Sequence, residues 1–462
     1  MTSDSFSSLP ISSAQVANLN SLGYTQMTAI QAQGLPYVLQ GRDLIAKAKT
    51  GSGKTATFGI GLLTQINPRF FGVQALVLCP TRELADQVGK ELRKLARSTP
   101  NIKLVLLCGG KPFAAQKASL EHGAHIVVGT PGRIQDHLSR GTLTLTGVQA
   151  LVLDEADRMM DMGFIDVINE IIEQTPEQRQ TLLFSATYPA AIKKMCAAIL
   201  NDPVTVSVES EHADSVIEQS FFQVKEPQRK SALLSLFEHY QPETSVVFCH
   251  TKIQCDEVAR FLHNHQIDAL AIHGDLEQRE RDQVLVRFAN RSCAVLVATD
   301  VAARGLDIKS LQAVINFELP HDPDIYVHRI GRTGRAGETG IALSLFTPQE
   351  HLRVKGIEEN QHKPCVVVPL ETLKATRGFT LQAPMVTIQL DSGRKNKVRP
   401  GDILGALTGD AGLSGSQIGK IDIYDLFSFV AVELTVVNKA LKYFQSENGK
   451  VKGRSIRVRK IA

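Results

Sequence analysis

The sequence predicts an α/β protein with two tandem domains, each built on a parallel β-sheet, and a small α+β domain of βαββαβ order at the end. The chain has 462 residues, 43% of them hydrophobic, which is enough for two or three packed domains. Strand-sized apolar runs alternate with helical patterns in the first third, and this arrangement then repeats. The last 80 residues differ in element order and in charge.

The first predicted sheet comes from six apolar runs at 43–48, 75–79, 103–107, 125–130, 150–154 and 181–187. Segments between them, such as 82–96, place apolar residues at the spacing of a helix. Alternating strands and helices are typical of a parallel sheet that helices cover on both faces.

The second predicted sheet rests on an internal repeat. Residues 77–88 align with 247–258, with five identities in twelve positions at an offset of 170, and 126–130 align with 295–299 at an offset of 169. Because the two offsets agree, we interpret the second part as a duplicated domain. The polar stretch 201–219 is interpreted as a linker, so we expect domains at 1–208 and 217–363.

The third predicted domain spans 383–462. It holds 13 lysines and arginines against 7 acidic residues, whereas the rest of the chain holds 38 against 40. This charge favours a polyanionic partner, although a small basic domain need not bind anything. The expected strands and helices are strands 385–390, 420–425, 427–434 and 454–460, and helices 399–409 and 435–445.

Targeting and cysteine signals are weak. The N-terminus lacks the pattern of a signal peptide, and no apolar run approaches the ~20 residues that span a membrane. The seven cysteines form no C-x-x-C pair. We therefore expect a reduced, cytoplasmic protein without a membrane span or structural zinc.

A phosphate-binding loop is predicted at 48–55, Ala-Lys-Thr-Gly-Ser-Gly-Lys-Thr, between an expected strand and an expected helix. Glycine lets backbone N–H groups turn onto phosphate, and the helix start adds partial positive charge. Lys54 is placed for the β- and γ-phosphates and Thr55 for Mg²⁺. The whole cradle is Ala48, Lys49, Thr50, Gly51, Ser52, Gly53, Lys54 and Thr55, in which Ala48 replaces the first glycine of the general pattern.

Two acids, Asp154 and Glu155, end the strand at 150–154. Beside a phosphate loop, Asp154 is predicted to hold Mg²⁺ and Glu155 to orient or deprotonate the attacking water. The segment 328–335, His-Arg-Ile-Gly-Arg-Thr-Gly-Arg, is predicted to supply Arg332 and Arg335 to the γ-phosphate. A solvated basic face is the alternative.

Together these motifs resemble the DEAD-box ATP-dependent RNA helicase family over roughly 6–350, which implies two RecA-like domains and the cofactors ATP and Mg²⁺. The motifs that carry the resemblance are Phe6 with 23–31, 48–55, 80–85 (Pro-Thr-Arg-Glu-Leu-Ala), 109–110, 130–133, Asp154-Glu155-Ala156-Asp157, 185–187, 246–251, 278–281, 298–307 and 328–335.

The resemblance implies roles for single residues. Gln31 would read the adenine with Phe6 beside it, Asp307 would contact the ribose, and Arg332 and Arg335 would act as arginine fingers. The residues that would couple nucleotide state to strand separation are Ser185, Thr187, Asp157 and His328. The residues that would line an RNA channel are Arg82, Gly110, Thr130, Arg133, Thr251, Gln278, Arg281 and Thr299. Met27-Thr28-Ala29 departs from the usual Pro-Thr-Pro.

The last domain resembles an RNA-recognition fold (RRM-like), and the chain as a whole resembles the DbpA-like subgroup. Phe427 and Phe429 share a strand face by alternation, as stacking aromatics would. That face is alternatively an ordinary core, with RNA contacts made by loops or by basic residues, among them Lys452, Arg454 and Arg457. The subgroup implies recognition of a large-subunit ribosomal RNA hairpin and work on pre-ribosomal particles in 50S assembly.

Several functions stay open at this point. The leading one is an RNA-stimulated ATPase that unwinds short duplexes near a bound structured RNA. The alternatives are a general RNA chaperone or ATP-gated RNA clamp without rRNA specificity, and a DNA helicase. We expect a monomer.

Overall fold

The structure is a computed structural model that describes residues 5–48, 52–188, 190–208, 217–303, 311–334, 339–374, 376, 378–446 and 449–461. The chain divides into two compact units, the first of which ends near residue 211. Two parallel sheets and a small antiparallel sheet confirm the predicted fold class.

The first unit is built on a seven-stranded parallel sheet of order β3-β4-β2-β5-β6-β1-β7. Its strands are β1 (Leu44–Lys47), β2 (Ala75–Leu78), β3 (Leu104–Leu107), β4 (Ile126–Gly129), β5 (Ala150–Asp154), β6 (Gln180–Ser185) and β7 (Val204–Ser207). Its α-helices are α1 (Ser13–Ser21), α2 (Ala29–Leu39), α3 (Lys54–Gln65), α4 (Arg82–Leu95), α5 (Phe113–Glu121), α6 (Pro131–Ser139), α7 (Ala156–Asp161), α8 (Ile165–Glu173) and α9 (Ala190–Ile199).

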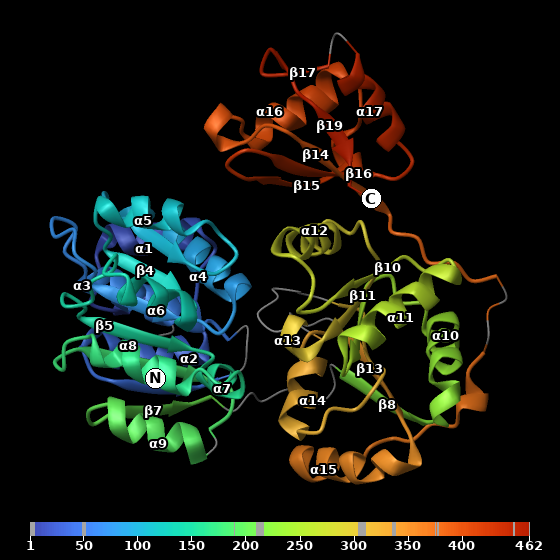
Figure 1. The fold of residues 1–462 in the computed structure, drawn as a ribbon, viewed down its shortest axis with the longest axis horizontal. Coiled ribbons are helices and arrows are strands. Elements are labelled where there is room, and N and C mark those ends of the chain that lie inside the picture. Colours follow the sequence, from blue (N-terminus) through green and yellow to red (C-terminus); the bar gives the residue numbers. More distant parts are fainter. Residues whose placement is uncertain are drawn as a thin grey trace. The chain divides into compact units, whose positions relative to one another are not determined.

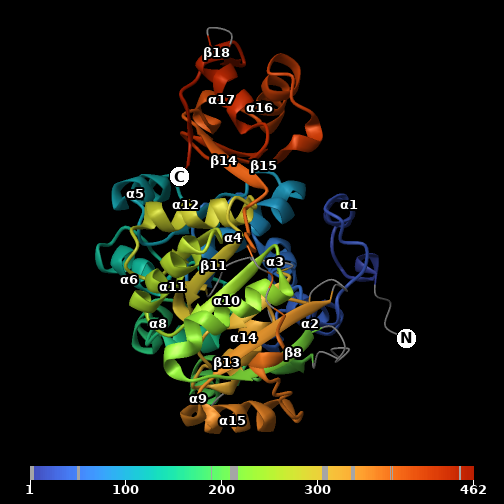
Figure 2. The same ribbon diagram turned by 90° about the vertical axis from the view of Figure 1, so that its right-hand side faces the viewer.

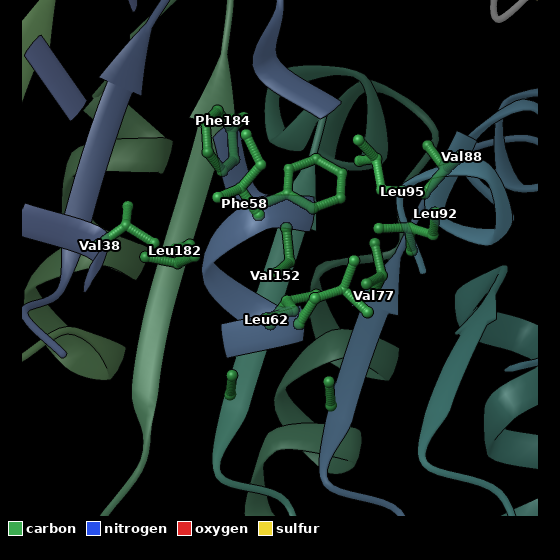
Figure 3. Close-up of a cluster of buried hydrophobic side chains, with 14 of the residues drawn as sticks. Val38, Phe58, Leu62, Val77, Val88, Leu92, Leu95, Val152, Leu182 and Phe184 are labelled. Carbon is green, nitrogen blue, oxygen red and sulfur yellow. The ribbon is translucent and has the colours of Figure 1, made fainter. Parts of the chain in front are cut away.

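Successive strand residues point to opposite faces of the sheet. Since these residues are apolar on both faces, helices cover both. On one face Phe58, Leu62 and Leu92 from α3 and α4 pack against Val77 and Val152 (Figure 3). The alternate strand residues form a second core with α6, α7, α8 and α9. This double burial holds the ends of the strands in fixed positions.

The second unit contains a six-stranded parallel sheet of order β10-β11-β9-β12-β13-β8. Its strands are β8 (Ile217–Gln223), β9 (Ser245–Cys249), β10 (Ala269–Ile272), β11 (Val295–Thr299), β12 (Ala313–Asn316) and β13 (Gly340–Phe346). Its α-helices are α10 (Arg229–Tyr240), α11 (Lys252–Asn264), α12 (Gln278–Ala289), α13 (Asp300–Ala303), α14 (Pro323–Ile330) and α15 (His351–Gln361). Helices α10 and α11 pack on one face, while α14 and α15 pack on the other (Figures 1 and 2).

The two sheets confirm the predicted duplication. In strand order, β3-β4-β2-β5-β6-β1 of the first sheet corresponds to β10-β11-β9-β12-β13-β8 of the second. The aligned threonines also match, because Thr81 Oγ1 accepts from Leu84 N and Thr251 Oγ1 accepts from Gln254 N, both at 3.2 Å. Each threonine therefore caps the helix that follows the equivalent strand.

The stretch 201–219 is not simply a linker, as the sequence had suggested. Val204–Ser207 forms β7, which pairs in parallel with β1, and β8 begins at Ile217. Val206 is the buried residue of β7, whereas Thr205 and Ser207 are exposed. Val204 and Val208 also pack against the core, so the segment alternates as a strand does, but the polar, acidic residues after it favour a linker by composition.

The C-terminal module, residues 383–461, has a four-stranded antiparallel sheet of order β15-β16-β14-β19. Its elements are β14 (Met385–Leu390), α16 (Pro400–Gly405), β15 (Ile418–Ile423), β16 (Ser428–Glu433), α17 (Val437–Gln445), β17 (Lys450–Val451), β18 (Arg454–Ser455) and β19 (Val458–Lys460). A short π-helix, Ala406–Asp410, extends α16.

One expected strand of this module was wrong in extent. The segment 454–460 divides into β18, which pairs only with β17, and β19, which joins the sheet beside β14. The β17–β18 hairpin turns at Lys452 and Gly453, whose φ angles of 54° and 75° are those of a two-residue hairpin loop. This hairpin places Lys452 at its tip.

Candidate nucleotide and RNA sites

The predicted nucleotide residues of the first unit follow three neighbouring strands. The sheet order places β5, β6 and β1 side by side, and all three run in the same direction. Their carboxyl ends therefore deliver Asp154, Ser185 and the loop after Lys47 to one edge of the sheet. Ligands of open α/β sheets bind at this edge.

The end of the phosphate loop is held by two side chains of α2 and its cap. Gln31 Nε2 donates to the Gly53 carbonyl at 3.2 Å, and Thr28 Oγ1 donates to the Ser52 carbonyl at 2.7 Å. Gly53 has φ of 97°, and a Cβ there would lie 2.6 Å from Gln31 Nε2. Only glycine fits this position without displacing its neighbours.

Thr28 was not singled out from the sequence, although a signal was present. The Gln31 side chain accepts from Thr28 N at 2.8 Å, and the pair forms a capping box. The pattern Thr-x-x-Gln before a helix predicts such a box. Phe6 packs edge-on against Tyr24 in the core, with ring centroids 6.3 Å apart.

Lys54 and Asp154 form the charged centre of this edge. Lys54 is buried, and its Nζ donates to the Ala48 carbonyl at 3.0 Å. Burial raises the pKa of Asp154 to about 6, against the opposing attraction of Lys54. Among the described residues, Asp154 Oδ1 is buried without a hydrogen-bond partner.

This orphaned carboxylate oxygen fits a divalent cation. Mg²⁺ prefers oxygen ligands and is held in nucleotide sites by one or two protein groups together with phosphate. The residues that would hold it are Asp154 and Thr55, the latter in the first turn of α3.

Glu155 stands where the strand turns sharply into α7. Its φ of 54° is left-handed, and its carboxylate accepts from Arg158 Nη1 at 2.7 Å in a buried ion pair. A strained backbone over-determined by its surroundings is typical of functional positions. Arg158, which the sequence reading did not single out, fixes the orientation of Glu155.

Asp157, in the first turn of α7, ties this helix to the segment that follows β6. Its Oδ2 accepts from Ala186 N at 3.1 Å, from Thr187 N at 2.9 Å and from Thr187 Oγ1 at 3.0 Å. Ser185 Oγ donates to the Thr187 carbonyl at 2.6 Å. The structure thus joins three of the four predicted coupling residues into one network within the first unit.

We predict that Asp154→Asn stabilises the first unit while it removes ATP turnover. A carboxyl whose pKa is raised on folding lowers stability above its folded value, and this penalty disappears below its unfolded value of 3.8. The variant should therefore gain about 1–3 kcal/mol at pH 7 to 8, and the gain should shrink as pH falls through 6. Urea unfolding followed by amide exchange in β5 and β6 checks this. Asp86→Asn, on the exposed side of α4, is the control. An equal gain there would show that the stabilisation does not come from removing the buried Asp154 charge.

The predicted RNA residues of the first unit follow the other strands of the same edge. Arg82, Gly110 and Thr130 come after β2, β3 and β4 respectively. Arg133 Nη1 donates to the Lys111 carbonyl and to Gln116 Oε1, both at 3.1 Å. Gln116 Oε1 also lies 3.1 Å from His137 Nε2, so Gln116, which the sequence did not single out, positions Arg133.

The predicted RNA residues of the second unit occupy equivalent places. Thr251 caps α11, Thr299 ends β11, and its Oγ1 accepts from Ala302 N at 3.4 Å. Gln278 and Arg281 lie in the first turns of α12.

The basic segment 328–335 contains an arginine with a different task from the predicted fingers. Arg329 is buried, and it donates to Asp300 through Nε at 2.6 Å and Nη2 at 2.8 Å. Its Nη1 donates to Asn316 Oδ1 at 2.9 Å and to the Glu318 carbonyl at 2.7 Å. His328 lies in α14 and Arg332 follows that helix. The predicted site residues outside the described ranges are Lys49, Thr50, Gly51, Asp307 and Arg335.

The C-terminal module has a hollow on its helical side. Its volume is about 750 Å³, and its lining includes Asp402, Asp410, Tyr443, Lys450 and Lys452. Lys452, Arg454 and Arg457 are all exposed.

The predicted aromatic face of the module is formed. The Phe427 and Phe429 rings lie 5.3 Å apart and both contact Tyr424. These rings share a cluster with Val286 of α12 and with Ile461. The shared face is therefore confirmed, but it contacts a helix of the preceding domain.

Comparisons with known proteins agree with this arrangement. The family models that match are DEAD/DEAH box helicase at 28–195, helicase conserved C-terminal domain at 228–337, and DbpA RNA binding domain at 387–460. The ATP-dependent RNA helicase DbpA of Escherichia coli is 52% identical over 96% of this chain and 97% of its own length. The DEAD-box ATP-dependent RNA helicase CshA of Bacillus subtilis is 44% identical over 77% and 72%.

A solved structure is also similar, namely S. cerevisiae Dbp5 bound to RNA and ADP BeF3. It has a TM-score of 0.73 and 30% identity, over 80% of this chain and 96% of that one. The chain belongs to the DEAD-box ATP-dependent RNA helicase family. Within that family it groups with the DbpA-like members, which add an RNA-binding C-terminal domain. In the described part of the chain, no helix has the length and apolar composition that crossing a membrane requires.

Proposed function

We propose that this RNA helicase works on large-subunit ribosomal RNA in pre-ribosomal particles of the cytoplasm, as a monomer and with Mg²⁺. The observation that carries the proposal is the basic, RNA-binding C-terminal module attached to a complete set of helicase motifs. The module would hold a structured RNA element, and the two RecA-like domains would unwind a short duplex nearby.

The chemistry follows from the first unit. ATP would lie on the loop that Gln31 and Thr28 support, with Lys54 neutralising its phosphates. The cation, when bound at Asp154 and Thr55, would neutralise charge on the phosphate oxygens. Glu155, held by Arg158, would orient or deprotonate the attacking water, and Arg332 and Arg335 would stabilise the γ-phosphate charge.

The nucleotide state would reach the RNA through Asp157. It binds Ala186 and Thr187, so a displacement of the start of α7, which follows β5, would move that segment as well. RNA would be held by Arg82, Gly110, Thr130 and Arg133 in one domain and by equivalent residues of the repeat. Contacts of this kind to the sugar-phosphate backbone carry no sequence information, so target choice would fall to the module.

The exposed basic residues of the module provide the test. We expect Lys452→Gln combined with Arg454→Gln and Arg457→Gln to weaken binding of large-subunit ribosomal RNA and to reduce the salt slope of log K by roughly 2 to 3. The triple variant should also lose the preference of ATP turnover for ribosomal RNA over a generic single strand.

A matched control is Lys439→Gln with Lys442→Gln, on α17 away from the hairpin tip. If the triple variant keeps both the salt slope and the ribosomal preference, these three basic residues do not form the RNA surface. If the wild-type protein shows no ribosomal preference, it is a general RNA chaperone or an ATP-gated clamp. A duplex-release assay then separates those two, because a clamp binds RNA without releasing a strand.

A further inference from the structure

One aromatic ring at the carboxyl edge of the first sheet lies outside the apolar packing. Phe113 begins α5, three residues after Gly110, and belongs to neither apolar core of the first unit as the structure describes them. It is half-buried, and its ring contacts polar and cationic side chains of α6 and the residue that ends it. Packing of the core therefore does not account for this ring.

The Phe113 ring is supported by a histidine with fixed partners. His137 stacks on it, with ring centroids 4.2 Å apart and an interplanar angle of 15°. His137 is buried, its Nδ1 lies 2.8 Å from Thr142 Oγ1, and its Nε2 lies 3.1 Å from Gln116 Oε1. Burial lowers the pKa of His137, and the nearby Arg133 lowers it further. The imidazole is therefore neutral near pH 7 and holds the ring in place.

Two arginines approach the same ring. The guanidinium carbon of Arg140 lies 4.6 Å from the Phe113 centroid, and that of Arg133 lies 5.9 Å from it. Asp136 orients both arginines, because its carboxylate lies 2.7 Å from Arg140 Nε and 3.6 Å from Arg133 Nε. The Arg140 side chain is nevertheless 62% exposed. A cation over an aromatic face at such a distance is attracted to it, so the ring and the guanidinium form one ordered surface.

The surroundings of this surface carry positive charge. Segments 109–122 and 130–140 hold four lysines and arginines against two acids, and one of those acids is the Asp136 that already pairs with both arginines. Lys111 and Lys117 are exposed. A positively charged surface with an ordered aromatic ring is complementary to a nucleic acid strand rather than to an apolar or basic partner.

We propose that Phe113 and Arg140 form a stacking subsite for one unpaired RNA base, beside the phosphate contact of Arg133. Single strands are held by cations that follow the backbone and by aromatic or guanidinium planes on which bases stack. Arg133 and Phe113 provide a cation and a ring at a separation of 5.9 Å. The subsite rests on the proposed RNA channel of the first domain and adds a base contact to its backbone contacts.

The subsite would favour single-stranded RNA over duplex RNA. A base within an A-form duplex is paired and stacked on its neighbours, so its face is not available to Phe113. A strand released during unwinding gains the contact, which opposes re-pairing. Since every base has a face that can stack, the subsite would not distinguish sequences, and target choice would still fall to the C-terminal module.

Photocrosslinking of the full-length protein tests the subsite directly. A generic single-stranded RNA with 5-iodouridine at successive positions, bound together with an ATP analogue, should crosslink to Phe113 from one position, because a stacked base is held against the ring. Phe113→Leu keeps an apolar side chain but should lose the crosslink and bind single strands about tenfold more weakly. Phe113→Tyr keeps a ring and should keep both.

The matched control is Phe71→Leu. The Phe71 ring also stacks on a histidine, His125, with centroids 4.7 Å apart, but the two residues precede β2 and β4 and so lie at the opposite edge of the sheet. Its loss should leave RNA binding unchanged. Single-strand binding by Phe113→Leu equal to that of Phe71→Leu, or no crosslink to Phe113 from any position, would overturn the subsite.

Salt dependence separates the ring from the cation. Arg140→Gln should reduce the salt slope of log K for a single strand by roughly 0.7, whereas Phe113→Leu should weaken binding at an unchanged slope, because stacking releases no counterions. Arg140→Lys should keep the slope but not the full affinity, because an ammonium has no plane to stack. If Phe113→Tyr binds no better than Phe113→Leu, the residue acts by packing alone and the subsite is refuted.

Arg133→Gln distinguishes failure of the subsite from failure of the proposed channel. If Arg133→Gln and Phe113→Leu both bind single strands as the wild type does, the RNA channel of the first domain is refuted. If Arg133→Gln binds more weakly while Phe113→Leu does not, the channel stands and the stacking subsite alone is refuted.

Discussion

Lys54→Ala should abolish RNA-stimulated ATP turnover, with a loss of at least about a hundredfold in kcat. Lys54 is a buried cation at the carboxyl edge of the first sheet, where its Nζ donates to the Ala48 carbonyl. This hydrogen bond would hold the Lys54 ammonium in position for the phosphates before ATP binds. Alanine leaves no positive side chain at that point, so the charge that develops on the phosphates is not neutralised.

The variant should also change the neighbouring carboxyl. Lys54 lowers the pKa of Asp154 from the higher value that burial alone would impose. Without it, the pKa of Asp154 should rise further above 6, and its ionisation, followed by infrared spectroscopy, should move to higher pH. Lys47→Ala, at the exposed end of β1, is the matched control and should keep turnover within about twofold. Undiminished turnover in Lys54→Ala would contradict a helicase that depends on ATP hydrolysis.

The fold was predictable because its signals are periodic and redundant. Strands such as those at 43–48 and 150–154 are recognisable by their hydrophobicity, and the repeat at an offset of about 170 gives the same information a second time. Strand β7 does carry a strand signal, because Val204, Val206 and Val208 alternate with polar residues and pack against the core of the first unit. The signal is short and is followed by a polar, acidic stretch, so composition alone favours a linker there.

The chemistry of the candidate site was predictable, but many of the hydrogen bonds that position its residues were not. Motif spacing indicates Lys54, Asp154 and Glu155, whereas several contacts that support other predicted site residues join positions far apart along the chain. Gln116 reaches Arg133 from 17 residues away, and Arg329 reaches Asp300 from 29. Such pairs have no local pattern, since only the fold brings them together.

The aromatic face of the C-terminal module was predictable only in part. Alternation placed Phe427 and Phe429 on one face correctly, but it could not say what covers that face. The covering residue, Val286, belongs to another domain about 140 residues earlier. An RNA-recognition order of elements therefore predicts the sheet without predicting that its stacking face is available.

Arg329→Ala should destabilise the second RecA-like domain by about 3–5 kcal/mol, the cost of breaking a buried ion pair by removing one partner. The Arg329 guanidinium makes two hydrogen bonds to Asp300 and also donates to Asn316 and the Glu318 carbonyl, and it lies 4.9 Å from the Phe248 ring centroid. Alanine leaves these acceptors without their donor in the protein interior. Arg329→Lys should recover little, because an ammonium cannot form the paired bonds to Asp300.

The measurement is urea unfolding of the full chain followed by amide exchange in β11, β12 and α14, which isolates this domain from the others. Lys230→Ala breaks the exposed pair with Glu257 and should cost no more than about 1 kcal/mol. Arg329 lies in α14, the helix that leads to Arg332, and it binds Asp300, the residue after Thr299. ATP turnover should therefore fall together with stability in both Arg329 variants. A loss of stability no larger than that of Lys230→Ala would show that Arg329 does not anchor the domain. A loss of stability with normal turnover would show that Arg329 anchors the domain without positioning Arg332, the predicted arginine finger.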